Sequence, residues 1–154
     1  MKNIFSLLLL ILVSEACFEG QPRISADHKS LSKIKGVVLF DAAPFSGVLY
    51  SVFINGSKKY EQEILEGKKH GIETMWYPNS QVRSVSEFSN GILNGSQKEW
   101  YRDGTPSREM DFIDGKQSGL QIGWETNGNL RFKYTYKDGK RYGFMGSALC
   151  QAPE

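Results

Sequence analysis

The chain has 154 residues and a formal net charge of +2, from 19 lysines and arginines against 17 aspartates and glutamates. This balance argues against a nucleic-acid-binding protein, which concentrates basic residues on one surface. With only two cysteines, Cys17 and Cys150, a disulfide framework is also excluded.

The first 16 residues have the features of an export signal. Lys2 precedes an apolar run from Ile4 to Val13, and small residues follow it. This run is shorter than the roughly 20 residues that cross a bilayer as a helix. We therefore predict a signal peptide at residues 1–16 and an exported protein.

Cys17 is expected to become the first residue after cleavage. The preceding Ser-Glu-Ala resembles, at Ala16, the signal before the acylated cysteine of bacterial lipoproteins. We predict lipidation of Cys17 by several acyl chains, since one chain holds a protein only weakly, and anchoring to an envelope membrane at its periplasmic or outer surface. The alternative is cleavage alone, which leaves a Cys17–Cys150 bridge open. Residues 17–35 lack a repeat pattern and are predicted to be the flexible tether of the anchor.

A 24-residue repeat fills most of the remaining chain. Two glycine columns and one tryptophan column recur at this interval: Gly47, Gly71, Gly95, Gly119 and Gly143; Gly67, Gly91, Gly115 and Gly139; and Trp76, Trp100 and Trp124. Such an unbroken interval indicates a repeat protein in which every unit is one small structural module.

Each repeat has the pattern of a β-hairpin. A turn-forming pair such as Asn55-Gly56 tolerates the positive φ of a tight hairpin turn. Runs rich in β-forming residues flank the equivalent pairs, as in IETMWY at residues 72–77. The second connection has the form Gly-x-x-x-Gly. Because a lone hairpin is hardly stable in water, the units are expected to stack.

We therefore predict an all-β fold, an elongated, single-layer antiparallel array of β-hairpins with a 24-residue period. The array is predicted at residues 36–146, with units starting near residues 47, 71, 95 and 119 and a half-repeat at each end. Gly36–Phe40 is the expected first half-repeat, and residues 147–154 form a C-terminal tail. Two strands per unit lengthen the sheet by roughly 10 Å per repeat.

The loop after each tryptophan decides which face of the sheet the tryptophan joins. A two-residue turn pairs Trp76 with Arg83 and places it opposite Phe88. A bulged loop reverses the parity and places both rings on one face. We favour the bulged loop, because one well-buried face stabilises more than two thin stripes, and Pro78 suits an irregular loop.

These columns resemble the MORN-repeat variant found in many bacterial envelope proteins. The resemblance covers about residues 45–146 and lies on one set of residues in each unit: Gly71, Trp76, Tyr77, Asn79, Phe88 and Gly91; Gly95, Trp100, Tyr101, Gly104, Phe112 and Gly115; and Gly119, Trp124, Gly128, Tyr136 and Gly139. Ser80 and Glu125 depart from the pattern. Relatives are described as antitoxins or as membrane-associating scaffolds, which implies a non-catalytic role.

Two groups of residues are candidates for binding. The first is an aromatic face that also suits packing between strands: Trp76, Tyr77, Trp100, Tyr101 and Trp124. The second is a basic rim on the Gly-x-x-x-Gly connections: Lys68, Lys69, Lys116, Lys140 and Arg141. Anionic lipid head groups or an acidic partner suit such a rim, whereas loop solubility explains the same residues.

No pattern predicts a catalytic centre, a cofactor or a metal site. His28 and His70 are isolated, and a single-layer sheet offers little concavity in which catalytic groups converge. Met145 and Cys150 alone do not complete a Cu(I) site. One carboxylate column is predicted to be a solvated polar face: Glu63, Glu87 and Asp111.

The sequence thus predicts an envelope-associated repeat protein that is not an enzyme. Its predicted role is protein binding or scaffolding, with an unidentified protein partner and a membrane contact through N-terminal acyl chains. The alternatives are an antitoxin-like partner that neutralises another protein and a module that binds lipid at a membrane surface. The oligomeric state stays open.

Overall fold

The computed structural model describes residues 20–145 and 148–150, with side chains described up to residue 143. The predicted signal peptide, the lipidation site Cys17 and most of the C-terminal tail lie outside these ranges. The described residues form strands, turns and loops, and none of them forms a helix long and apolar enough to cross a membrane.

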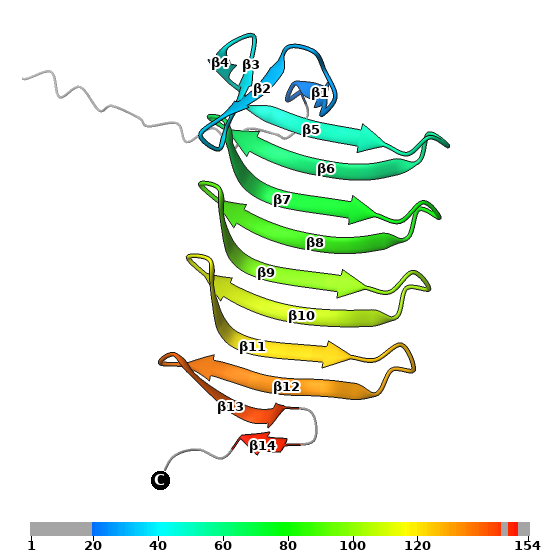
Figure 1. Ribbon diagram of the computed structural model, residues 1–154, viewed down its shortest axis with the longest axis vertical. Coiled ribbons are helices and arrows are strands. Elements are labelled where there is room, and N and C mark those ends of the chain that lie inside the picture. Colours follow the sequence, from blue (N-terminus) through cyan, green and yellow to red (C-terminus); the bar gives the residue numbers. More distant parts are fainter. Residues whose placement is uncertain (1–19, 146–147, 151–154) are drawn as a thin grey trace, which may run out of the picture.

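Eleven strands form one long sheet in which nearly all neighbours in space are neighbours in sequence (Figure 1). In spatial order they are β1 (Arg23–Ser25), β5 (Gly47–Val52), β6 (Lys58–Leu65), β7 (Lys68–Trp76), β8 (Val82–Ser89), β9 (Ile92–Trp100), β10 (Pro106–Ile113), β11 (Lys116–Trp124), β12 (Leu130–Lys137), β13 (Lys140–Met145) and β14 (Ala148–Cys150). All pairs from β5 onward are antiparallel, and β1 pairs with β5 in parallel. The predicted all-β hairpin array with its 24-residue period is confirmed.

Two kinds of connection lie at opposite ends of the strands, along two sides of the sheet (Figure 1). Two-residue turns lie along one side, and both residues of each turn have the positive φ that such turns require: Glu66-Gly67, Asn90-Gly91, Asp114-Gly115 and Asp138-Gly139. Five-residue loops lie along the other side, at residues 53–57, 77–81, 101–105 and 125–129. The tight turns therefore lie in the Gly-x-x-x-Gly connections and not at Asn55-Gly56, where only the glycine has positive φ.

A bulge follows each five-residue loop, as predicted. Trp76 pairs with Val82 and Met75 with Ser84, which leaves Arg83 without a partner in the ladder. The predicted shared face of tryptophan and phenylalanine is nevertheless wrong. The bulge affects only the last pair, and regular alternation along β7 places Trp76 on the face opposite Met75, whereas Phe88 shares the face of Met75 and Ser84.

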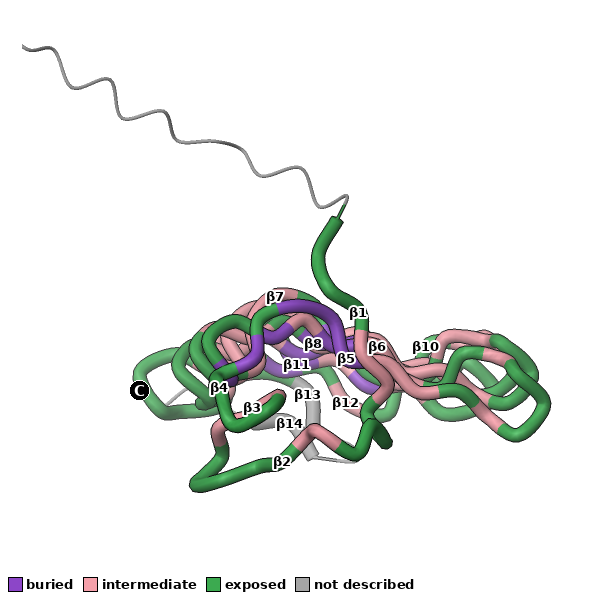
Figure 2. Tube along the Cα trace, turned by 90° about the horizontal axis from the view of Figure 1, so that it is seen from above, coloured by how far each residue is buried: buried purple, intermediate pink, exposed green. Residues whose placement is uncertain are grey.

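The N-terminal residues form a cap on one face of the sheet. A second, three-stranded sheet contains β2 (Leu31–Ile34), β3 (Val37–Phe40) and β4 (Ala43–Pro44). Figure 2 shows these strands to one side of the long sheet. We call the sheet face that they contact the cap face, and the other the opposite face.

The main apolar core lies between the cap and the cap face. Phe45, Leu49 and Ile64 are buried, and these partly buried side chains pack against them: Ile24, Leu31, Val38, Phe40 and Tyr60. The prediction of a flexible tether is therefore wrong for residues 20–35, because Ile24 and Leu31 bury apolar surface. The predicted half-repeat is also corrected, since β3 pairs with β2 and β4 and does not join the array.

Candidate functional site

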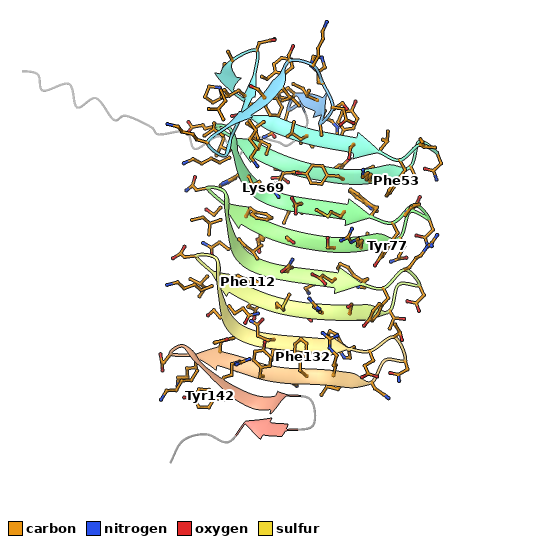
Figure 3. All side chains as sticks on the ribbon, in the orientation of Figure 1. Phe53, Lys69, Tyr77, Phe112, Phe132 and Tyr142 are labelled. Atoms are coloured by element: carbon orange, nitrogen blue, oxygen red, sulfur yellow. The ribbon has the colours of Figure 1, made fainter. Side chains whose placement is uncertain are left out.

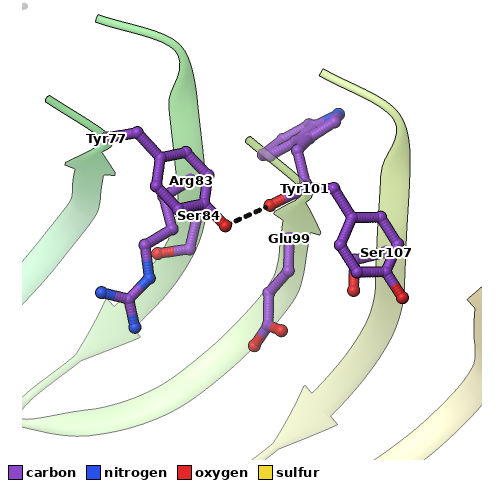
Figure 4. Close-up of a pocket in the computed structure, with 7 residues that line it drawn as sticks. Tyr77, Arg83, Ser84, Glu99, Tyr101 and Ser107 are labelled. Atoms are coloured by element: carbon purple, nitrogen blue, oxygen red, sulfur yellow. Dashed lines mark hydrogen bonds between the residues drawn. The ribbon is translucent and has the colours of Figure 1, made fainter. Parts of the chain in front are cut away.

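Hydrogen bonds connect successive five-residue loops along one side of the array. The Tyr77 hydroxyl donates to the Trp100 carbonyl over 3.0 Å (Figure 4). The Tyr101 hydroxyl likewise donates to the Trp124 carbonyl over 2.9 Å. The amide of Asn79 likewise donates to the Arg102 carbonyl over 3.0 Å. Every bond joins one repeat to the next, so the tyrosine hydroxyls have a structural role.

The tryptophan rings do not form a single surface with the tyrosines. Trp76 is half-buried, and the Lys58 ammonium lies 5.3 Å from its ring centroid. Lys58 is paired with Glu61, which lies on the opposite face of the sheet. Of the five aromatic candidates, the structure brings Tyr77, Trp100 and Tyr101 together around one hollow.

Another hollow is related to this one by the 24-residue repeat. Their volumes are about 260 Å³ and about 160 Å³. Six lining positions of the first recur 24 residues later in the second: Phe53 and Tyr77, Lys59 and Arg83, Tyr60 and Ser84, Met75 and Glu99, Trp76 and Trp100, and Arg83 and Ser107. Each hollow therefore has an aromatic side chain from a loop and a bulge residue from the following strand (Figure 4).

The bulge residues are functional candidates that the sequence analysis missed. They recur at the 24-residue interval, seven positions after the tryptophan column: Lys59, Arg83, Ser107 and Arg131. Lys59 and Arg131 lie over aromatic rings of the cap face, 5.9 Å from the Phe53 centroid and 5.3 Å from the Phe132 centroid. Their spacing was visible in the sequence, but the bulge that turns them onto this face was not.

The cap face carries an excess of positive charge. Its cations outnumber its carboxylates: Lys59, Lys69, Arg83, Arg108, Arg131 and Arg141 against Glu73 and Glu99. Glu73 is paired with Lys69, and Glu99 lies 4.0 Å from Arg108. Among the described residues, the other four cations have no carboxylate within ion-pair distance.

The predicted basic rim is divided by the fold. Lys68, Lys116 and Lys140 are exposed beside the two-residue turns. Three of those turns begin with an acidic residue, which offsets the rim charge: Glu66, Asp114 and Asp138. Lys69, which is labelled in Figure 3, and Arg141 instead lie over aromatic rings of the cap face. The Lys69 ammonium is 4.6 Å from the Phe88 ring centroid, and the Arg141 guanidinium is 5.9 Å from that of Tyr134.

The carboxylate column caps backbone groups and is not simply a solvated face. Glu87 accepts a hydrogen bond from the Ser96 N–H, and Asp111 accepts one from the Leu120 N–H, both over 3.2 Å. Burial raises the pKa of Glu63, which the Ile72 N–H opposes. These N–H groups follow glycines with positive φ, where the strand departs from regular pairing.

Two glutamines occupy the interior of the cap face. Gln62 and Gln121 are fully buried. The Gln121 amide donates to the carbonyls of Asp111 and Ser118, each over 2.9 Å, and Gln62 makes the equivalent pair of bonds to Glu63 and His70. They satisfy carbonyls that the irregular pairing leaves without a ladder partner.

The family model of the MORN repeat variant matches residues 69–90 and 117–138. These segments contain the β7–β8 and β11–β12 hairpins, which lie two repeats apart. MORN repeats are generally protein- or membrane-binding modules and are typically non-enzymatic. No curated protein and no solved structure matches the chain.

An ionic cluster, with a buried carboxylate, lies on the cap face beside the cap. The Glu73 carboxylate accepts a hydrogen bond from the Lys69 ammonium and lies near the Tyr60 hydroxyl. Burial, and then the neighbouring Glu73 charge, raise the pKa of Tyr60 far above its usual range. Within residues 20–145 and 148–150, no group of three or more His, Cys, Asp and Glu side chains is placed to hold a metal ion.

The Tyr60 cluster predicts a loss of stability in alkali. In the unfolded chain Tyr60 ionises near pH 10, whereas in the folded chain it keeps its proton, so the unfolded state binds fewer protons above about pH 10. The free energy of unfolding should therefore fall as the pH rises beyond that value. Urea unfolding of Tyr60→Phe from about pH 8 to about pH 11 should show a shallower fall than the unmodified protein. Tyr136→Phe, on distant β12, is the control, and an equal effect of both variants would contradict the assignment.

Proposed function

We propose that this protein is a non-catalytic binding module of the cell envelope, and that a protein partner occupies its cap face beyond the cap. The observation that supports this is the pair of hollows whose lining positions match at an interval of 24 residues. A surface that repeats its chemistry at a constant interval suits an elongated partner, because each repeat adds an equivalent contact.

The composition of the cap face supports a protein partner. Half-buried aromatic side chains line it beyond the cap: Phe112, Phe132 and Tyr136. No strand among the described residues covers this part of the face. Aromatic residues and arginine are enriched in the energetic centres of protein interfaces.

A role in binding a membrane surface is less well supported. The rim that would contact lipid alternates Lys68, Lys116 and Lys140 with the acidic residues of the adjacent turns, which weakens attraction to an anionic surface. The cations without a carboxylate partner lie instead on the cap face, where Lys59 and Arg83 line the hollows. An antitoxin-like role is a special case of partner binding, in which the captured protein is toxic.

Site-specific photo-crosslinking tests the proposed surface in intact cells. A photoreactive amino acid at Ser107, in the second hollow, should give a discrete crosslinked protein. The same probe at Thr135, exposed on the opposite face of β12, should give none. Absence of a crosslink at Ser107, or equal crosslinking from both positions, would refute the proposal.

Envelope anchoring through Cys17 is the second part of this proposal, supported by the N-terminal sequence. Cys17→Ser should move the protein from the membrane fraction to the soluble fraction, since the acyl chains provide the anchor. Mass spectrometry of the unmodified protein should show the added acyl mass on a chain that begins at Cys17. Membrane retention of the variant would exclude this mode of anchoring.

A further inference from the structure

We infer that the partner segment on the cap face is an acidic, extended polypeptide that crosses the strands and places a carboxylate at the cationic bulge residues. This inference rests on the proposed function and adds the chemistry and the spacing of the partner. It follows from the charge of the bulge column and from the geometry of the repeat.

The bulge column presents cations that the protein itself does not neutralise. Lys59, Arg83 and Arg131 are exposed, and no carboxylate among the described residues lies within ion-pair distance of them. Two of the three are arginines, whose planar guanidinium group binds a carboxylate through two parallel hydrogen bonds. Opposite charge across an interface also excludes wrong partners and determines the register of binding.

The spacing of the column matches an extended chain. Successive bulge residues lie on β6, β8, β10 and β12, two strands apart, which is about 10 Å. A polypeptide in the polyproline II conformation is also extended. It advances about 3.1 Å per residue with three residues per turn, so every third side chain lies on the same side, roughly 10 Å farther along. A segment that crosses the strands can therefore present an acidic side chain at every third position to one bulge residue after another.

The column also gives the segment a register. Ser107 interrupts the cations, so the pattern along the array is cation, cation, hydroxyl, cation. The matching segment has acidic residues at its first, fourth and tenth positions and a neutral polar residue at its seventh. Beside the first three bulge residues, Phe53, Tyr77 and Tyr101 offer an aromatic surface to the residues between the charges, whereas the equivalent loop position before Arg131 is Glu125.

Three synthetic peptides of ten residues test this inference on the purified protein. One has glutamate at positions 1, 4 and 10 and serine at position 7, the second has the same composition with the glutamates adjacent, and the third has glutamine in place of glutamate. Fluorescence anisotropy should show binding of the spaced peptide at least about tenfold tighter than the clustered one. The glutamine peptide should bind weakest of the three.

Charge-reversal variants locate the site. Arg83→Glu and Arg131→Glu should each weaken binding of the spaced peptide by at least about tenfold. Lys133→Glu makes the same charge change on the opposite face of β12 and should leave binding unchanged. Arg83→Gln, a milder change at an exposed position, guards against loss of fold, and the thermal transition of each variant should match that of the unmodified protein.

Other outcomes overturn the inference. Equal affinity for the spaced and clustered peptides would mean that only total charge is sensed. Tighter binding to vesicles containing anionic phospholipid, or to a single-stranded oligonucleotide, with the same loss on Arg83→Glu, would assign the cations to another polyanion. If the Ser107 crosslink forms but the spaced peptide shows no preference, the acidic segment is refuted while the binding surface stands. If the crosslink is absent, both fail.

Discussion

Gly95→Ala is expected to lower the free energy of unfolding by about 2–4 kcal/mol. Gly95 has a φ of 121°, which side chains other than glycine rarely adopt. An added Cβ would also overlap the Glu87 carboxylate, which accepts the Ser96 N–H. The variant thus combines backbone strain with displacement of a capping carboxylate, and urea unfolding followed by circular dichroism measures the loss.

Two control variants separate these contributions. Gly56 also has positive φ, at 80°, but an added Cβ there meets no atom within 4 Å, so Gly56→Ala reports backbone strain alone. Combining Gly95→Ala with Glu87→Ala removes the overlapping carboxylate, leaves only the close contact between the two Cβ atoms, and should recover part of the loss. If Gly95→Ala is no more destabilising than Gly56→Ala, the carboxylate has no part in the effect.

Gln121→Leu is expected to lower the free energy of unfolding by about 2 kcal/mol. The fully buried amide donates to the carbonyls of Asp111 and Ser118, and leucine would leave both without a partner. Loss of the Gln121 Oε1, which is buried without a partner in the structure, offsets part of the cost. Thermal or urea unfolding measures the difference.

Gln97→Leu is the matched control for this prediction. Gln97 occupies the same column of the cap face one repeat earlier, but it is only half-buried, and among the described residues its side chain has no hydrogen-bond partner. The substitution should therefore have little effect on stability. A loss as large as that of Gln121→Leu would show that burial of any glutamine in the column matters, and not the two carbonyls.

The turns show where sequence patterns become ambiguous. Asn55-Gly56 and Asp114-Gly115 both have residues that favour positive φ. Only the second is a two-residue turn, because pairing of β10 with β11 continues to Ile113 and Lys116, whereas β5 and β6 stop pairing at Val52 and Lys58. The choice depends on the ladder that forms on each side, which the local sequence does not contain.

The candidate site was predictable only in part. Tyr77, Trp100 and Tyr101 were identified from their columns, and they do line one hollow. The role of the tyrosine hydroxyls was not visible, since each reaches a carbonyl in the next repeat. The bulge residue Arg83 was assigned no role, because its direction depends on a single unpaired position in β8.

The sequence by itself determined the hairpin, its period and the stacking of the units, because these depend on residues within one repeat and on its repetition. Only the tertiary structure decided that Ile24 and Leu31 form a cap on Leu49, and that Arg83 lies on the cap face while Trp76 lies on the opposite one. Residues 20–45 contain no repeat, so their position depends on apolar burial against distant strands. Which face of the sheet a side chain occupies depends on local bulges, because one unpaired residue reverses the alternation of the side chains that follow it.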